Sequence, residues 1–309
     1  EHIEFIRHSD TVTYRIKTHR STALLRIHRP VSAAMGDHGL DVNAVRSEMQ
    51  WLEALSLETE APVQHPLRNL QGELVNRVQL EPQDEIYHCT LLSWLEGQPY
   101  LRELESAETA AQIGAITGLL HRHSRNWPLP AGFTRPRRDS AYFEQVLAAL
   151  QPAVADGRIS RSDYHQLQRS VELLLADLAS QPPDPAQAGL MHADIHKGNL
   201  LIHNGKIRLI DFSFCAFGPY CFDLAICCSD MQPQFHRAFL QAYQRLCPLQ
   251  PGYHRLVEGL FIGSMVGTFS FWAANPRAAE WLARKVPQVV QNYAASYNAG
   301  APFWFLDEA

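Results

Sequence analysis

The sequence carries no excess of positive charge and no extended apolar run. Its 27 Lys and Arg residues are outnumbered by 32 Asp and Glu residues, which gives a formal net charge of −5. Proteins that bind the phosphate backbone usually show an excess of basic residues, so this balance argues against nucleic acid as a partner. No apolar run approaches the roughly 18 to 20 residues of a membrane span, and no basic-then-apolar leader opens the chain. We therefore expect no membrane partner.

The six cysteines lack the spacing of a structural metal site. They form no C-x-x-C pair, and two of them, Cys227 and Cys228, are adjacent, which is a poor arrangement for zinc. This usage favours a reducing compartment, and we expect a cytoplasmic protein. With 46% hydrophobic, 10% aromatic and 19% charged residues, the 309-residue chain has enough apolar material for two packed lobes.

The first third of the chain is rich in short segments of β-branched and aromatic residues. Polar residues separate these segments, which predicts three antiparallel strands followed by two more. The predicted strands are residues 3–6, 11–16, 22–27, 73–80 and 85–94. Between the third and the fourth, Asp41 can cap a helix whose apolar residues fall at helical spacing. These are Val45, Met49 and Leu52.

The pattern changes to helical periodicity near residues 96–99 and stays helical to the C-terminus. We therefore predict an α+β protein of two lobes. Residues 1–95 form a small antiparallel-sheet lobe that binds nucleotide, and residues 96–309 form a larger, mainly helical lobe with the catalytic loop and the acceptor site.

Three polar residues surround a predicted hairpin in the second lobe. Asn204-Gly205 lies between two apolar segments, which is a strong signal for a two-residue type I′ turn. The predicted pairs are His203 with Lys206, Ile202 with Ile207, Leu201 with Arg208, Leu200 with Leu209, and Asn199 with Ile210. Asn199 and Asp211 thus emerge side by side and offer hard oxygen ligands for Mg²⁺. Asp194, five residues earlier, lies near the same end and can accept a proton from a hydroxyl group.

Each of these residues has an ordinary structural interpretation when taken alone. Asp194 can cap a turn, Asn199 can satisfy loop backbone, and Asp211 can end a strand. The combination of H-x-D-x-x-x-x-N, a hairpin and Asp-Phe-Ser is much more specific. It favours phosphoryl transfer.

These motifs resemble those of the aminoglycoside phosphotransferase and choline kinase superfamily, whose fold is similar to that of protein kinases. His192-Ala-Asp194-Ile-His-Lys-Gly-Asn199 is similar to the catalytic loop, Ile210-Asp211-Phe-Ser to the metal-binding segment, and Gly218-Pro219-Tyr-Cys-Phe-Asp223-Leu-Ala to the motif that follows. The stretch also looks like bacterial homoserine kinases. The resemblance implies a protein-kinase-like bilobal fold, with ATP and Mg²⁺ as cofactors.

The same resemblance assigns roles to particular residues. Asp194 would be the catalytic base and His192 a support within the catalytic loop, with Asp223 bracing that loop. Asn199 and Asp211 would bind Mg²⁺. Ser93 and Leu95, where the lobes join, would contact the nucleotide base through their backbone.

The chain departs from the family pattern at the phosphate-binding lysine. It has only four lysines, and Arg26 occupies the matching position on the third strand. A guanidinium group stays charged and can grip phosphate oxygens and a carboxylate together, so Arg26 is expected to bind phosphate with Glu48 as its helix partner. The alternatives are a packed surface arginine and a solvated glutamate.

The first strands also lack a glycine-rich loop. No glycine occurs before Gly36, and His8-Ser9-Asp10-Thr11 occupies the turn between the first two strands. Ser9 can donate to a phosphate, although an ordinary hairpin turn explains the segment equally well.

Three functional hypotheses follow. The first is an ATP-dependent kinase that phosphorylates a small hydroxylated acceptor, namely an amino alcohol, an amino acid or an aminoglycoside. The second is a protein Ser/Thr kinase similar to the bacterial stress-response kinases of this superfamily. The third is a nucleotide-binding pseudokinase, suggested by Arg26 and the missing glycines. The intact Asp194, Asn199 and Asp211 argue against the third. These motifs do not distinguish a peptide hydroxyl from the hydroxyl of a metabolite, and we favour the first hypothesis.

Overall fold

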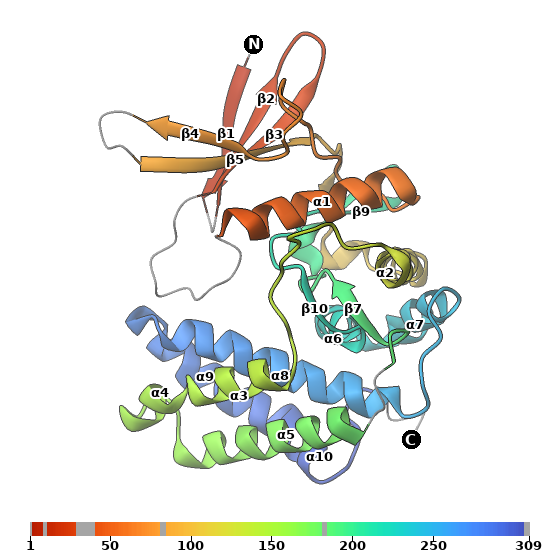
Figure 1. Cartoon of the computed structure of the whole chain (residues 1–309). Helices are drawn as coiled ribbons and strands as arrows, with labels where there is room; N and C mark the ends of the chain where they lie inside the picture. The colour runs from red at the N-terminus through yellow and green to blue at the C-terminus, as the bar shows by residue number, and fades with distance from the viewer. Residues whose placement is uncertain (1, 9–10, 29–40, 81–84, 181–183, 306–309) are drawn as a thin grey trace.

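An antiparallel sheet forms the N-terminal part of the protein. The computed structural model describes residues 2–8, 11–28, 41–80, 85–180 and 184–305 (Figure 1). Five strands pair in the order β1-β2-β3-β5-β4. Their bounds are His2–His8 for β1, Thr11–Lys17 for β2, Thr22–His28 for β3, Asn76–Leu80 for β4 and Glu85–Ser93 for β5. All five strands expected from the sequence are present, with the fourth shorter than predicted.

Helix α1 lies between this sheet and the rest of the protein (Figure 1). It spans Val42–Glu58 and begins at Asp41, whose side chain accepts a hydrogen bond from the Asn43 backbone. The predicted apolar residues are buried on one face of the helix: Val45, Met49 and Leu52, joined by Leu55. The cap and the helical spacing in the sequence are therefore sufficient to place this helix.

Two small sheets follow and carry the catalytic segments. β6 (Gln98–Pro99), β8 (Leu200–His203) and β9 (Lys206–Leu209) form one sheet, and β7 (Ala188–Met191) pairs with β10 (Ala216–Pro219) in the other. The four β8–β9 pairs have the register predicted from the turn. Asn204 and Gly205 have φ of 49° and 72°, as a type I′ turn requires. Ile210 N donates to Asn199 O at 3.0 Å, which continues the pairing to Asn199.

The C-terminal part is mainly helical. Its helices are α2 (Ala107–Asn126), α3 (Ser140–Ala148), α4 (Gln151–Ala155), α5 (Arg161–Ser180), α6 (Cys221–Asp230), α7 (His236–Gln244), α8 (Tyr253–Ala273), α9 (Ala279–Val289) and α10 (Ala295–Asn298). The predicted α+β architecture is therefore confirmed. The main sheet ends at Ser93, but β6 already belongs to the hairpin sheet, and the proposed division at residues 95 and 96 stays a prediction.

One sequence expectation was wrong. Helix α8 has 21 residues and is long and apolar enough to cross a membrane, whereas no such run was expected. The run is concealed in the sequence because the helix contains Arg255 and Glu258 near its start. Most of the apolar stretch is buried within the protein, as in a core helix, so α8 is weak evidence for a membrane span.

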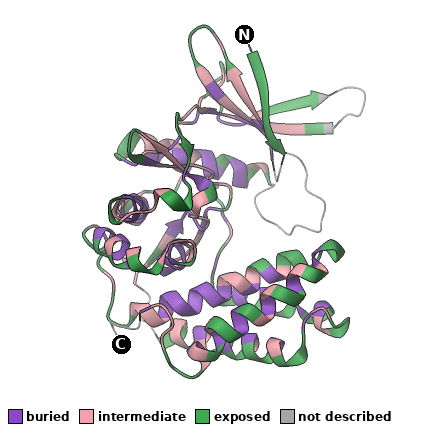
Figure 2. Cartoon of the chain, turned by 180° about the vertical axis from the view of Figure 1, so that it is seen from behind, coloured by how far each residue is buried: buried purple, intermediate pink, exposed green. Residues whose placement is uncertain are grey.

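Burial differs sharply between individual elements of the structure. Strand β1 is exposed along its length, whereas α1 and α8 carry long buried stretches (Figure 2). All six cysteines are buried and free, so they contribute to the core and form no disulfide.

Candidate active site

The loop that follows β7 is held by one buried carboxylate. Asp223, in the first turn of α6, is fully buried and accepts hydrogen bonds from the backbone N–H groups of His192, at 3.0 Å, and Ala193, at 2.6 Å. His121 Nε2 lies 3.0 Å from the same carboxylate. Ala193 has a φ of 63°, which is uncommon outside glycine, so these bonds hold the loop in a strained conformation. Asp223 thus occupies the bracing position that the resemblance implied.

His192 supports the loop from within. Its Nδ1 accepts a hydrogen bond from the Asp194 backbone at 3.2 Å, and its Nε2 lies 3.2 Å from Ile210 O. In this arrangement Nδ1 accepts and Nε2 donates to the Ile210 carbonyl. His192 links the catalytic loop to the segment that carries Asp211, and this places it as a positioning residue.

Asp194 and Asn199 are in direct contact. Asn199 Nδ2 donates to Asp194 Oδ2 at 2.7 Å and to the Asp194 carbonyl at 3.0 Å. Because the amide nitrogen is used in this way, the amide oxygen is the atom that can bind a cation. About 30% of the Asp194 side chain is exposed, so a substrate hydroxyl can reach it. His196 Nε2 lies 3.5 Å from Asp194 Oδ2, and this contact raises the pKa of His196.

Asp211 lies among positively charged and hydrogen-bonding groups. Arg7 Nη2 is 2.8 Å from Asp211 Oδ2, Arg26 Nη2 is 3.9 Å from Oδ1, and the Ser213 hydroxyl donates to Oδ1. Burial alone would raise the pKa of Asp211, but Arg26, Ser213 and Arg7 together hold the pKa below its ordinary value. Asp211 is therefore a carboxylate at neutral pH and a suitable ligand for a cation.

The donor set fits Mg²⁺ better than a transition metal. Within the described ranges, no three His, Cys, Asp or Glu side chains gather into a metal cluster. Mg²⁺ does not need one, because it keeps several waters and takes phosphate oxygens as further ligands. Asn199 and Asp211 lie at the same end of the hairpin, and their amide oxygen and carboxylate are hard oxygen donors of the kind that such a site uses.

Arg26 and Glu48 form the ion pair expected from the sequence. Arg26 Nη1 lies 2.5 Å from Glu48 Oε1, and only 5% and 2% of the two side chains are exposed. The pair joins β3 to α1 and directs the second Arg26 nitrogen toward Asp211. The surface interpretations of Arg26 and Glu48 are therefore excluded. Contact with phosphate stays a prediction.

Replacing Glu48 with glutamine is expected to lower the free energy of unfolding by about 3 kcal/mol, because the buried Arg26 charge then loses its close partner and keeps the more distant Asp211 at 3.9 Å. Urea denaturation measures this loss. Glu53→Gln on the same helix is the matched control. It breaks an ion pair with Arg68, whose side chain is half exposed, and should cost less than about 1 kcal/mol. Equal losses in the two variants would contradict the buried-pair assignment.

Arg135 has a structural role that the sequence does not signal. Its guanidinium donates to Cys215 O at 2.6 Å, to Ala44 O at 3.0 Å and to Ser213 O. It therefore ties the start of α1 to the segment that follows Asp211. Residues 126–136 are typical of a loop, and no local pattern indicates a buried arginine there. Arg7 was missed for the same reason, because its partner lies 204 positions away.

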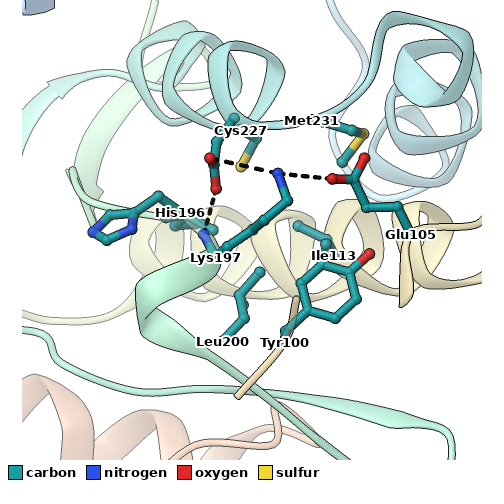
Figure 3. Close-up of a pocket in the computed structure, with 10 residues that line it drawn as sticks. Tyr100, Glu105, Ile113, His196, Lys197, Leu200, Cys227 and Met231 are labelled. Atoms are coloured by element: carbon teal, nitrogen blue, oxygen red, sulfur yellow. Dashed lines mark hydrogen bonds and ion pairs between the residues drawn. The ribbon is translucent and has the colours of Figure 1, made fainter. Parts of the chain in front are cut away.

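Lys197 is not available to substrate in the way that its place in the catalytic loop suggests. Its Nζ lies 2.8 Å from Glu105 Oε1 and 3.4 Å from Asp230 Oδ1, and its backbone N–H also donates to Asp230. Figure 3 shows the ammonium group inside a pocket that Tyr100 and Met231 also line. Lys197 therefore anchors the loop to α6 and to the segment before α2.

The remaining predicted nucleotide contacts are less defined. Ser9 lies outside the described residues. The Ser93 backbone N–H donates to His65 O at 2.8 Å, and its carbonyl accepts from Gln64 Nε2 at 3.2 Å. A nucleotide base at Ser93 would have to share these groups with residues 64 and 65. Leu95 lies two residues beyond the end of β5, and both contacts stay predictions.

Comparison with known proteins is consistent with this geometry. Residues 2–258 match the sequence profile of the phosphotransferase enzyme family. The chain belongs to this family. It is 25% identical to the homoserine kinase of Neisseria meningitidis serogroup B over 211 residues, which cover 62% of this chain and 63% of that protein. The chain thus spans just under two thirds of the length of this curated relative.

Solved structures of other phosphotransferases share the fold. The microcompartment-associated aminopropanol kinase superposes with a TM-score of 0.79 at 21% identity, covering 97% of this chain and 93% of that one. Amicoumacin kinase hAmiN, in complex with AMP-PNP, Ca²⁺ and Ami, gives 0.74 at 17% identity, covering 99% and 90%. The bilobal, kinase-like arrangement that the motifs implied is therefore confirmed.

Proposed function

We propose that this phosphotransferase moves the γ-phosphate of ATP to the hydroxyl group of a small molecule, namely an amino alcohol, an amino acid or an aminoglycoside. The observation that carries the proposal is the placement of Asp194, Asn199 and Asp211 around one hairpin end, with Asp194 partly exposed. Relatives named as homoserine kinase and amicoumacin kinase support a small-molecule acceptor.

Each residue of the site has a separate proposed role in phosphoryl transfer. Asp194 would orient the acceptor hydroxyl and take its proton as the oxygen attacks phosphorus. Arg26, held by Glu48, would bind phosphate oxygens and so position the nucleotide. Mg²⁺, held by Asn199 and Asp211, would neutralise phosphate charge when bound. The AMP-PNP and Ca²⁺ in the amicoumacin kinase structure support a nucleotide with a divalent cation.

We also propose a cytoplasmic location, which the six free cysteines support. The partners would be the nucleotide and the acceptor.

The test is Mg²⁺-dependent ADP release with a panel of amino alcohols, hydroxy amino acids, aminoglycosides and generic protein substrates. Asp194→Asn serves as the blank. Turnover on one small molecule is the expected result. Turnover on the protein substrates alone would favour a protein kinase, and ATP binding without turnover of any acceptor would favour a nucleotide-binding pseudokinase.

A further inference from the structure

Arg138 is a second buried arginine near the catalytic loop, and it forms no ion pair with any residue that the structure describes. Arg138 is only 6% exposed, yet its Nε and Nη1 find no hydrogen-bond partner within the described part of the chain. Its two basic neighbours differ from it. Arg135 is bound by backbone carbonyls, and Arg137 pairs with Asp139 at the surface.

Backbone hydrogen bonds connect Arg138 to the strand that precedes the catalytic loop. Arg138 N donates to Phe217 O at 2.7 Å, and Phe217 pairs with Leu190 in the β7–β10 ribbon. A Cβ atom on Gly218 would lie 2.6 Å from Met191 Cε and 3.1 Å from Arg138 Cβ. The side chains of Met191 and Arg138 therefore both pack against the ribbon at Gly218. Met191 is the last residue of β7, three positions before Asp194.

The Arg138 side chain also packs against helix α3, which in turn contacts helix α8. Its guanidinium carbon lies 4.3 Å from the ring centre of Tyr142 on α3, and the Tyr142 hydroxyl packs closely against Gly267 of α8. Arg138 therefore lies between the catalytic loop and the α3–α8 pair. Burial lowers the pKa of Arg138, Arg135 lowers it further, and Tyr142 and Asp194 act in the opposite direction.

A buried guanidinium group with unused N–H donors lowers the stability of the folded protein unless a ligand accepts hydrogen bonds from it. Its planar arrangement of N–H groups fits a carboxylate, which can accept two parallel hydrogen bonds. Tyr142 lies against the guanidinium group, and the unused Nε and Nη1 are the donors that such a partner would bind.

We propose that Arg138 binds the carboxylate of the acceptor, so that the acceptor is a hydroxylated carboxylic acid such as a hydroxy amino acid. This inference rests on the proposed kinase function and narrows its substrate class. The carboxylate would be held by Arg138 while the hydroxyl lies at Asp194. An amino alcohol or an aminoglycoside would leave Arg138 unpaired.

Matched substrate pairs test this assignment. Homoserine and 3-aminopropan-1-ol differ only by the carboxylate, as do threonine and 1-aminopropan-2-ol, and each pair is compared by kcat and KM with MgATP. The carboxylate member is expected to have a KM about 10- to 100-fold lower, as a charge-assisted contact provides. Arg138→Gln should remove this preference by raising the KM of the acids alone, while kcat and MgATP affinity change little.

Two further variants keep the test decisive. Arg137→Gln removes an exposed neighbouring charge and should leave the preference intact. Arg138→Lys keeps the charge and should retain part of the preference even if Arg138→Gln does not fold. Preferred turnover of amino alcohols or aminoglycosides would overturn the inference and still support the kinase function. Equal losses for both members of a pair would assign Arg138 a purely structural role. A lack of ADP release with any acceptor would reject the kinase function itself.

Discussion

Replacing Asp194 with asparagine is expected to lower kcat by about 100- to 10,000-fold and to leave the affinity for MgATP near that of the native protein. The amide cannot accept the proton of the acceptor hydroxyl, but it has almost the same volume and keeps an oxygen for the Asn199 Nδ2 hydrogen bond. Steady-state kinetics with the identified acceptor, together with calorimetric titration of MgATP, measure the two effects separately.

A matched Asp→Asn change elsewhere controls for a general loss of charge. Asp156 pairs with Arg158 on the surface, with half of its side chain exposed, and Asp156→Asn should leave both kcat and MgATP affinity unchanged. If Asp194→Asn retained native turnover, Asp194 would not be the base. A loss of MgATP binding in that variant would instead place Asp194 at the nucleotide.

The second large effect concerns Asp211. Asp211→Ala is expected to weaken MgATP binding at least about 10- to 100-fold, because Mg²⁺ loses its carboxylate ligand. In the presence of EDTA the same variant should bind metal-free ATP as well as the native protein or better. The reason is that Arg7 and Arg26 no longer have this carboxylate as a competitor for phosphate oxygens.

The contrast between the two variants is the decisive result. Calorimetry should show that Asp194→Asn binds MgATP and that Asp211→Ala binds it poorly. If both bound MgATP equally well, the metal assignment to Asp211 would be wrong. If the Asp211 variant bound metal-free ATP more weakly as well, its defect would be structural.

Local patterns in the sequence were enough to place much of the site. The Asn204-Gly205 turn sets the register of β8 and β9, and the register sets the position of Asn199, because side chains in a hairpin are paired one by one. The resemblance to the family pattern paired Arg26 with Glu48, and the strand and helix signals placed each of them on its element. Local signals were therefore sufficient for the hairpin, whereas the ion pair also needed the resemblance.

Other parts of the site depend on contacts between segments far apart in the chain. The place of Lys197 in the catalytic loop suggests a contact with substrate, but its partners Glu105 and Asp230 come from two other segments. Arg7, Arg135 and Arg138 lie in stretches without a motif, and only the folded chain shows what surrounds them. Packing between distant segments decides whether such an arginine is exposed, is bound by backbone carbonyls, or is buried with unused N–H donors.

The hydrogen bonds of Arg135 fix the position of helix α1 within the protein. It fastens Ala44 at the start of α1 to the segment after Asp211, and the Thr134 N–H donates to Ser47 of the same helix at 2.9 Å. Glu48 of α1 meanwhile binds β3 through Arg26. Contacts on both sides therefore hold α1 in place between β3 and the segment after Asp211. The sheet and the catalytic segments are joined through this helix.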